Sequence, residues 1–317
     1  MSDPKREAQG VAFILVGMIL WGLFPIFTKL GVAGTTPILF GAVTALIASL
    51  PLVTTAAAQR AVPPRRNRRM WRDLLYIAIV GTVLPIGLFF TGIALTSGIN
   101  AGILQQMEPI YSLLLSYFVL REALPGKQLL GGGLLLAGAV VVLTAGGGGA
   151  LRGSGQALVP ALQRSGLAGG VLVMLAPIGY QLAHLRTKRM LNENANSFVI
   201  SGFRLLFGGT MLLAVSAALL AAGAVRFEHP PLTAAFVALT AAYAFSVISA
   251  EKIMWLEGIR RINLSKASGF LPLSVLASAA GASLVLHEAL TWKHYAGAAL
   301  VIAGTYILSR VPSRTRG

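Results

Sequence analysis

The residues best suited to bind a polar solute surround one glutamate in an apolar stretch. Gln105, Glu108 and Tyr111 or Ser112 recur at helical spacing and share one helix face. Pro109 has no amide hydrogen, so the carbonyl of Gln105 loses its usual helical partner and becomes an available acceptor. A carboxylate, an amide and a freed carbonyl on one face would suit a polar or cationic solute. A structural ion pair, or a carboxyl that stays protonated, is the alternative reading of Glu108.

Two further pairs of polar and aromatic residues lie one helical turn apart. Glu251 and Trp255 form one pair, and Tyr180 and His184 form the other. Glu251 is a candidate for lining a cavity, and His184 is a candidate proton site because imidazole titrates near neutral pH. The shallow position of the first pair also suits residues that extend to the membrane surface, as we expect of the neighbouring Lys252.

Prolines interrupt several apolar stretches and are predicted as hinges. Trp21 stands four residues before a proline, as Gln105 does, and each proline frees a carbonyl on the preceding turn. A kink that only shapes packing is the other reading. The predicted hinges are Pro25, Pro85, Pro109, Pro177 and Pro272, and the predicted solute contacts are Trp21, Gln105, Glu108, Tyr111, Tyr180, His184, Glu251 and Trp255.

Two basic residues also fall inside apolar stretches. Lys29 and Arg204 lie within one or two turns of the end of such a stretch. We expect their charged groups to reach the membrane surface while their stems stay in apolar surroundings.

The composition places these residues in a polytopic membrane protein. Of the 317 residues, 56% are hydrophobic and only 11% are charged, against roughly a quarter charged in an average soluble domain. Cysteine is absent, which excludes disulfides and thiolate chemistry. The net charge of +16 collects in short segments between apolar runs. Basic loops beside membrane spans account for that charge without nucleic acid as a partner.

Ten apolar stretches are long enough to cross a membrane, and a Gly-rich linker over 146–166 separates five from five. The polar start leads into an apolar run without a small-residue cleavage site, so we expect the first span to be retained. The domains are therefore 1–145 and 167–317. The predicted spans are 11–31, 36–57, 74–95, 100–120, 127–145, 167–187, 197–221, 233–255, 267–286 and 292–310.

The basic residues predict the orientation of these spans. An amino terminus in the cytoplasm puts most lysines and arginines on the cytoplasmic side, as the positive-inside rule requires. Both termini are then cytoplasmic, and the basic residues left outside are Arg152, Arg164, Arg226 and Lys293.

An internal repeat joins the two halves. The segment 120–124, Leu-Arg-Glu-Ala-Leu, returns as Leu-His-Glu-Ala-Leu at 286–290, and a Gly-x6-Gly helix follows each copy. Because each half has five spans, the copies must lie upside down relative to each other. Glu122 and Glu288 should favour the start of the helix that follows each turn. The glycines of the two Gly-x6-Gly helices should permit close packing: Gly131, Gly138, Gly297 and Gly304.

These features resemble the drug/metabolite transporter superfamily, in particular ten-helix members built from two EamA domains. The resemblance rests on Trp21-Gly22, on Gln106-x-x-Pro109, on the paired Leu-x-Glu-Ala-Leu turns and on the Gly-x6-Gly helices. It implies transport of a small molecule, usually export, through a central cavity lined by both halves. Family members often carry an arginine in both second-type helices, whereas here only Arg204 is present.

We therefore expect a secondary transporter in a bacterial inner membrane, most simply an exporter of an amino acid, metabolite or drug. No Gly-x4-Gly-Lys-Ser/Thr loop is present for ATP, and no cofactor is expected. Exchange against a proton at Glu108 is the hypothesis for coupling. A lipid-modifying enzyme that uses His287, Glu288 and His294 is an alternative from another class. A passive channel is the third possibility.

Overall fold

The computed structural model describes residues 4–61, 67–118, 126–145, 166–225, 233–259, 261–262, 267 and 270–309. Every regular element in these ranges is helical, and six helices are long and apolar enough to cross a membrane. Two shorter apolar segments, 234–250 and 272–285, accompany them. The protein is a multi-pass membrane protein built from helices alone over the described ranges.

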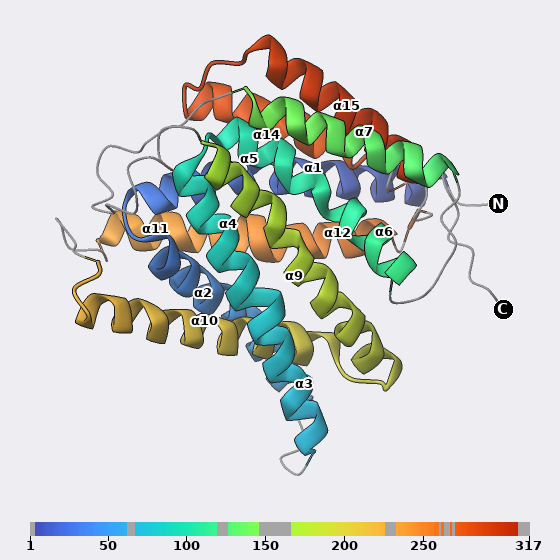
Figure 1. Ribbon diagram of the computed structural model, residues 1–317. Helices are drawn as coiled ribbons and strands as arrows, with labels where there is room; N and C mark the ends of the chain where they lie inside the picture. Colours follow the sequence, from blue (N-terminus) through green and yellow to red (C-terminus); the bar gives the residue numbers. More distant parts are fainter. Residues whose placement is uncertain are drawn as a thin grey trace.

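The helices pack side by side in one bundle (Figure 1). Two π-helical segments and one 3-10 turn interrupt them. The α-helices are α1 (Pro4–Ala33), α2 (Pro37–Ala58), α3 (Arg68–Ala78), α4 (Leu84–Leu95), α5 (Gly98–Leu104), α6 (Glu108–Phe118), α7 (Gly126–Leu143), α9 (Leu167–Asn192), α10 (Ser197–Ala221), α11 (Ala234–Tyr243), α12 (Glu251–Ile259), α14 (Pro272–Val285) and α15 (Trp292–Ser309); the interruptions are η1 (Ile79–Val83), η2 (Gln105–Met107) and η3 (Ala244–Ala250).

Helix occurs in each of the ten ranges that were predicted to span, but three of those ranges are composite. The third joins α3, η1 and α4, the fourth joins α5, η2 and α6, and the eighth joins α11, η3 and α12. Part of the ninth range, before α14, lies outside the described residues, as do most of the linker 146–166 and the turn that contains Glu122. Ten spans therefore stay a prediction.

Side-chain caps explain where several helices begin. Thr36, Ser97 and Thr233 each accept a hydrogen bond from the backbone N–H three residues later, and Asn67 and Asn196 cap α3 and α10 in the same way. These oxygens satisfy amide groups that a helix start leaves without an intrahelical partner. Polar residues between apolar runs thus set the helix boundaries.

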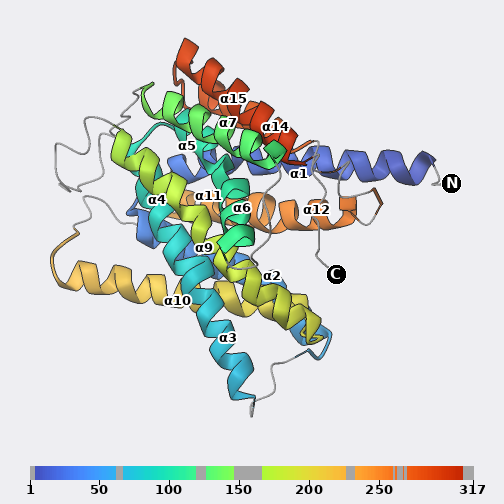
Figure 2. The same cartoon turned by 45° about the vertical axis from the view of Figure 1, so that its right-hand side comes forward.

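Helices of the first half pack against helices of the second half. Gly131 of α7 packs on Gly304 and Leu308 of α15, and Gly138 packs on Gly297. The order of these contacts makes the two helices antiparallel, and both views show them side by side (Figures 1 and 2). Added Cβ atoms there would meet backbone oxygens at 2.6–3.0 Å. The predicted close packing of the Gly-x6-Gly helices is confirmed.

Three more antiparallel pairs join the halves. Helix α2 packs on α10, where Leu46 meets Gly209 and Val53 meets Gly202. Helix α4 packs on α9 through Gly92 and Gly169. Helix α1 packs on α12 in the same manner. The two halves are thus interleaved rather than laid side by side.

The two π-helical segments occupy equivalent places in the repeat. The Leu-x-Glu-Ala-Leu turns are 166 residues apart, and the same offset carries η1, residues 79–83, onto 245–249, which lie inside η3. A π-helical turn inserts one residue into a helix and frequently marks a functional site. The repeat is therefore visible in the backbone as well as in the sequence, because both halves carry a π-helical segment at the equivalent position.

Candidate functional site

Glu108 accepts a hydrogen bond from a residue of the opposite half. The Nε2 of Gln181, on α9, donates to Oε1 of Glu108 at the start of α6, with a donor–acceptor distance of 2.7 Å. Both residues lie well inside their spans. A carboxylate and an amide from different halves therefore meet within the membrane-spanning part of the protein. A polar group at that depth costs free energy, so it is a candidate for a functional role.

The turn before Glu108 is irregular, as the proline in the sequence indicates. Gln105 begins the 3-10 turn η2, and Pro109 is the second residue of α6. The Gln105 side chain is only 6% exposed, and neither its Oε1 nor its Nε2 has a hydrogen-bond partner. A buried amide without a partner normally costs about 1–3 kcal/mol, so this group is suited to meet a solute.

Tyr111 also contacts the second half, but away from Glu108. Its hydroxyl donates to the carbonyl oxygen of Met174 on α9 at 2.6 Å. Ser112, the alternative on that face, is exposed. Gln106, next to Gln105, reaches α14, where its Nε2 donates to the Ser274 hydroxyl at 3.0 Å.

Tyr180 precedes Gln181 on α9 and interacts electrostatically with Glu108 and with Arg204. The prediction that Arg204 reaches the membrane surface is wrong. Its Nε is buried, and its side chain lies beside Gly81 of η1, where an added Cβ would be 3.6 Å from Arg204 Cδ. Tyr180 on α9 therefore interacts with an acid of the first half and a base of the second half.

Lys29 is the second correction to the sequence prediction. It is 4% exposed and does not reach solvent. Its ammonium group donates to the carbonyl of Ile93, in the last turn of α4, at 2.9 Å, and to the carbonyl of Thr96, directly after that helix. A cation at a helix C-terminus satisfies carbonyls that have no intrahelical partner and interacts favourably with the helix dipole.

Glu288 holds the same joint between α4 and α5 from its other side. Its two carboxylate oxygens accept the backbone N–H groups of Gly98, at 2.7 Å, and Ile99, at 2.9 Å. It thus caps α5, and the expectation that it would favour its own following helix, α15, is wrong. The joint at 96–97 is held from α1 by a cation and from the turn before α15 by an anion.

His294 completes this cluster. Its Nδ1 accepts the N–H of Thr291 at 2.9 Å, so its Nε2 carries the proton and donates to Oδ1 of Asn100 at 3.0 Å. The Asn100 amide in turn donates to the Thr96 hydroxyl at 3.3 Å. We call Lys29, Asn100, Glu288 and His294 the Ser97 clamp, and this end of the bundle the Ser97 end.

The chemistry proposed for an enzyme does not assemble around this clamp. Both ring nitrogens of His294 are occupied, and His287 is exposed at a positive φ of 53°. Among the residues that the structure describes, no three His, Asp or Glu side chains gather as metal ligands would.

The other four predicted contacts lie on three helices. Trp21 stacks on Phe24 with ring centroids 5.1 Å apart. Glu251 is buried at the start of α12, and Trp255 packs with Ile14 and Met18 of α1. His184 is exposed on α9. A role in solute binding stays a prediction for all four.

The five prolines differ in their surroundings. Pro85, Pro109 and Pro272 stand at the first or second position of an α-helix, the first two directly after η1 and η2. Pro25 and Pro177 lie inside uninterrupted helices. A role as hinges stays a prediction for all five.

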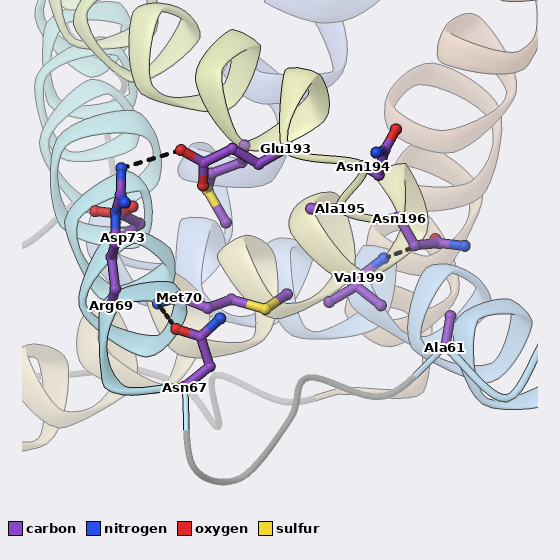
Figure 3. Close-up of a pocket in the computed structure, with 11 residues that line it drawn as sticks. Ala61, Asn67, Arg69, Met70, Asp73, Glu193, Asn194, Ala195, Asn196 and Val199 are labelled. Carbon is purple, nitrogen blue, oxygen red and sulfur yellow. Dashed lines mark hydrogen bonds and ion pairs between the residues drawn. The ribbon is translucent and has the colours of Figure 1, made fainter.

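A pocket of about 330 Å³ opens at the opposite end of the bundle, which we call the Asn67 end. It lies between the start of α3 and the α9–α10 connection (Figure 3). Arg69 pairs there with Glu193 at 3.0 Å. None of the predicted solute contacts lines it. The pocket is lined by Ala61, Asn67, Arg69, Met70, Asp73, Met190, Glu193, Asn194, Ala195, Asn196 and Val199.

Sequence reasoning missed Gln181, which contacts Glu108. It stands in an apolar stretch, and an amide at such depth was the available signal. Only the packing of α9 against α6 shows that the two residues meet.

Comparison with known proteins places the whole chain among transporters. Residues 8–144 and 167–310 each match the EamA-like transporter family. An uncharacterized transporter of Methanothermobacter thermautotrophicus is 26% identical over 96% of this chain and 87% of its own length. The uncharacterized transporter YetK of Bacillus subtilis is 25% identical with the same coverage.

Two further comparisons agree in part. The uncharacterized inner membrane transporter YhbE of Escherichia coli is 28% identical over 40% of each chain. A solved crystal structure superposes with a TM-score of 0.57 at 20% identity, covering 96% of both chains. That likeness concerns the fold alone.

Proposed function

The chain belongs to the EamA-like transporter family, and we propose that it is a secondary transporter that moves a small organic solute by alternating access. Amino acids, metabolites and drugs are the candidate solutes. The direction is export from the cytoplasm across a bacterial inner membrane. The route runs through the interior region around Glu108.

An inverted repeat supports this mechanism. The repeat units are residues 1–145 and 167–317, with five spans each, joined by the linker 146–166. The antiparallel pairs α2 with α10 and α7 with α15 each join a helix to its own counterpart. Equivalent helices that pack antiparallel are what a two-fold axis in the membrane plane produces. Two such halves can exchange conformations, and the access side changes with them.

The observation that carries the proposal is the hydrogen bond between Glu108 and Gln181. The two residues come from different repeat units, yet their polar atoms are 2.7 Å apart in the interior. Solute sites in transporters of this kind lie near the midplane between the repeats. A relative movement of the halves would separate this pair. The change of the access side would then also change the groups that are available to bind the solute.

The Ser97 clamp supports a state that is closed at one end. Lys29 and Glu288 hold the joint between α4 and α5 by backbone hydrogen bonds, and the rings of Phe24, Phe40 and Tyr243 pack together nearby. We assign the Asn67 end to the cytoplasm because arginines gather there, in keeping with the positive-inside rule. Both termini are then cytoplasmic, and the Ser97 end is the outer, closed end.

Glu108 is also the proposed proton site. A carboxyl inside a span can lose its proton to one side and regain it from the other as access changes. Solute and proton would then compete for the same oxygens, which yields exchange of one against the other. The Gln181 amide holds the carboxylate in place in the solute-free state.

The test is transport by purified protein in vesicles across a pH series. Wild type, Glu108→Gln and Glu193→Gln would be compared with a radiolabelled amino-acid mixture and an imposed pH gradient. Glu193 is the control because it is half exposed at the Asn67 end, away from the interior. Uphill accumulation in wild type and in Glu193→Gln, with at least a tenfold loss and no pH dependence in Glu108→Gln, is expected.

Two results would contradict the proposal. An unaltered rate and pH dependence in Glu108→Gln would remove this carboxylate from the mechanism. Flux that only dissipates a solute gradient in wild type would indicate a passive channel, since a channel cannot drive accumulation.

A further inference from the structure

Arg204 is partly buried with its Nε fully buried, and none of the carboxylates that the structure describes pairs with it. It is the eighth residue of α10, about 10 Å along the helix axis from its first turn. Its side chain lies where η1, α9 and α10 meet, because Gly81 of η1 faces both Ala183 of α9 and Arg204. An added Cβ on Gly81 would be 3.8 Å from Arg204 Nη1, which is ordinary van der Waals contact, and 2.5 Å from Ala183 Cβ. The guanidinium therefore lies directly beside a point where η1 and α9 approach closely.

Several other described arginines form ion pairs, while Arg6, Arg60, Arg68 and Arg72 are exposed. Arg186, two turns along α9 from Tyr180, pairs with Asp73 at 3.0 Å, and Arg69 and Arg189 pair with Glu193. By contrast, no described carboxylate pairs with Arg204, and its buried Nε has no hydrogen-bond partner. The described carboxylates are Glu7, Asp73, Glu108, Glu193, Glu251, Glu257 and Glu288.

An unpaired buried charge is expensive, so a protein keeps one where a ligand supplies the counter-charge. The guanidinium presents five N–H donors in a planar fork that fits carboxylate and phosphate oxygens. Tyr180 interacts electrostatically with Arg204 and also with Glu108. Arg204 and Glu108 thus both act on the segment of α9 that contains Tyr180 and Gln181.

We infer that the transported solute carries an oxyanion group and that Arg204 binds it between η1, α9 and α10. This inference rests on the proposed function and specifies the substrate class of the same region. Glu108 faces the opposite part of such a solute, so a molecule with a positive or proton-donating group at its other end fits both charges.

The first test is the stability of the solute-free protein. Arg204→Met removes a charge that has no partner, so its Tm should stay unchanged or rise by a few degrees. Arg186→Met is the matched control, because it removes a paired arginine and leaves the nearly buried Asp73 carboxylate unpaired. Its Tm should fall. A clear fall of the Tm in Arg204→Met would mean that Arg204 serves a structural partner, and it would overturn the inference.

The second test identifies the head group by thermal shift. Free amino acids, their N-acetyl derivatives and their amides would be compared, with glycerol 3-phosphate as the phosphate arm and inorganic phosphate as the head group alone. The free amino acids, the N-acetyl derivatives or the phosphate ester should raise the Tm of wild type and of Arg186→Met. They should not change the Tm of Arg204→Met, and the amides should not change the Tm of any of the three proteins.

Three results would contradict the inference. The Tm could rise with the amides alone, it could still rise with an oxyanion in Arg204→Met, or it could stay unchanged with every oxyanion.

Failure of the proposed function would give a different result. If vesicles show no uphill flux while oxyanion binding still depends on Arg204, the transport mechanism is wrong and the site stands. If amides are transported at equal rates by wild type and Arg204→Met, transport stands and the oxyanion site is wrong.

Discussion

Glu288 connects parts of the chain that are almost two hundred residues apart. Its carboxylate accepts two backbone N–H groups at the start of α5. Hydrogen bonds to a charged acceptor contribute roughly 1.5–3 kcal/mol, and the loss of a helix cap costs about 0.5–2 kcal/mol. The residue therefore matters for the stability of the Ser97 end.

We predict that Glu288→Ala lowers the free energy of unfolding by about 1–2 kcal/mol, because two amide groups lose their acceptor. Glu193→Ala is the control. Glu193 forms two ion pairs, but its side chain is half exposed, so its loss should cost about 0–1 kcal/mol. Thermal unfolding in detergent measures both. Equal losses in the two variants would show that the helix cap adds nothing beyond a surface ion pair.

Sequence reasoning found residues of the interior by chemical type but not their partners. Glu108, Gln105 and Tyr180 were predicted because polar groups are rare in spans, and they lie in or beside the interior region. Lys29 and Arg204 were predicted at the membrane surface, because distance from a span end does not reveal which helix packs above it. Carbonyls at the end of α4 hold Lys29 inside.

At the scale of elements, glycine spacing determines how the halves pack. Gly138 on α7 faces Gly297 on α15, whereas Gly133 on the same helix faces open space. One face of α7 is thus adapted to a helix neighbour, and another is free of neighbours.

Alanine at these two glycines should have opposite effects. In Gly138→Ala, the new Cβ would lie 2.8 Å from the Gly297 carbonyl oxygen, so the free energy of unfolding should fall by about 1–3 kcal/mol. In Gly133→Ala the new Cβ would have no neighbour within 4 Å, so the gain in helix propensity should raise the free energy of unfolding by up to about 1 kcal/mol. Unfolding followed by circular dichroism compares them; a stabilised Gly138→Ala would contradict the packing described.

Helix positions were predictable from apolar length, while the irregular turns were not. Pro109 indicated a break near Gln105, and the 3-10 turn lies there. The π-helical segments η1 and η3 contain no proline or other local signal. Their matching positions emerge only from the repeat offset and the packing of α9 and α10 against η1.

At the scale of the whole molecule, the account depends on two units in opposite orientations. The repeat in the sequence and the odd number of predicted spans per half led to this prediction. The antiparallel pairs of equivalent helices support it, but the sides of the membrane follow only from the distribution of basic residues. An experiment that reports sidedness is therefore the most direct test.

The chain contains no cysteine, so single cysteines can be introduced and labelled without a background. Lys127→Cys, at the start of α7, and Ala289→Cys, before α15, occupy exposed positions beside the two Leu-x-Glu-Ala-Leu turns. A membrane-impermeant maleimide added to intact cells should label the cysteine at 289, and the cysteine at 127 only after the membrane is opened. Labelling of both positions from the same side would contradict the inverted arrangement and the alternating access built on it.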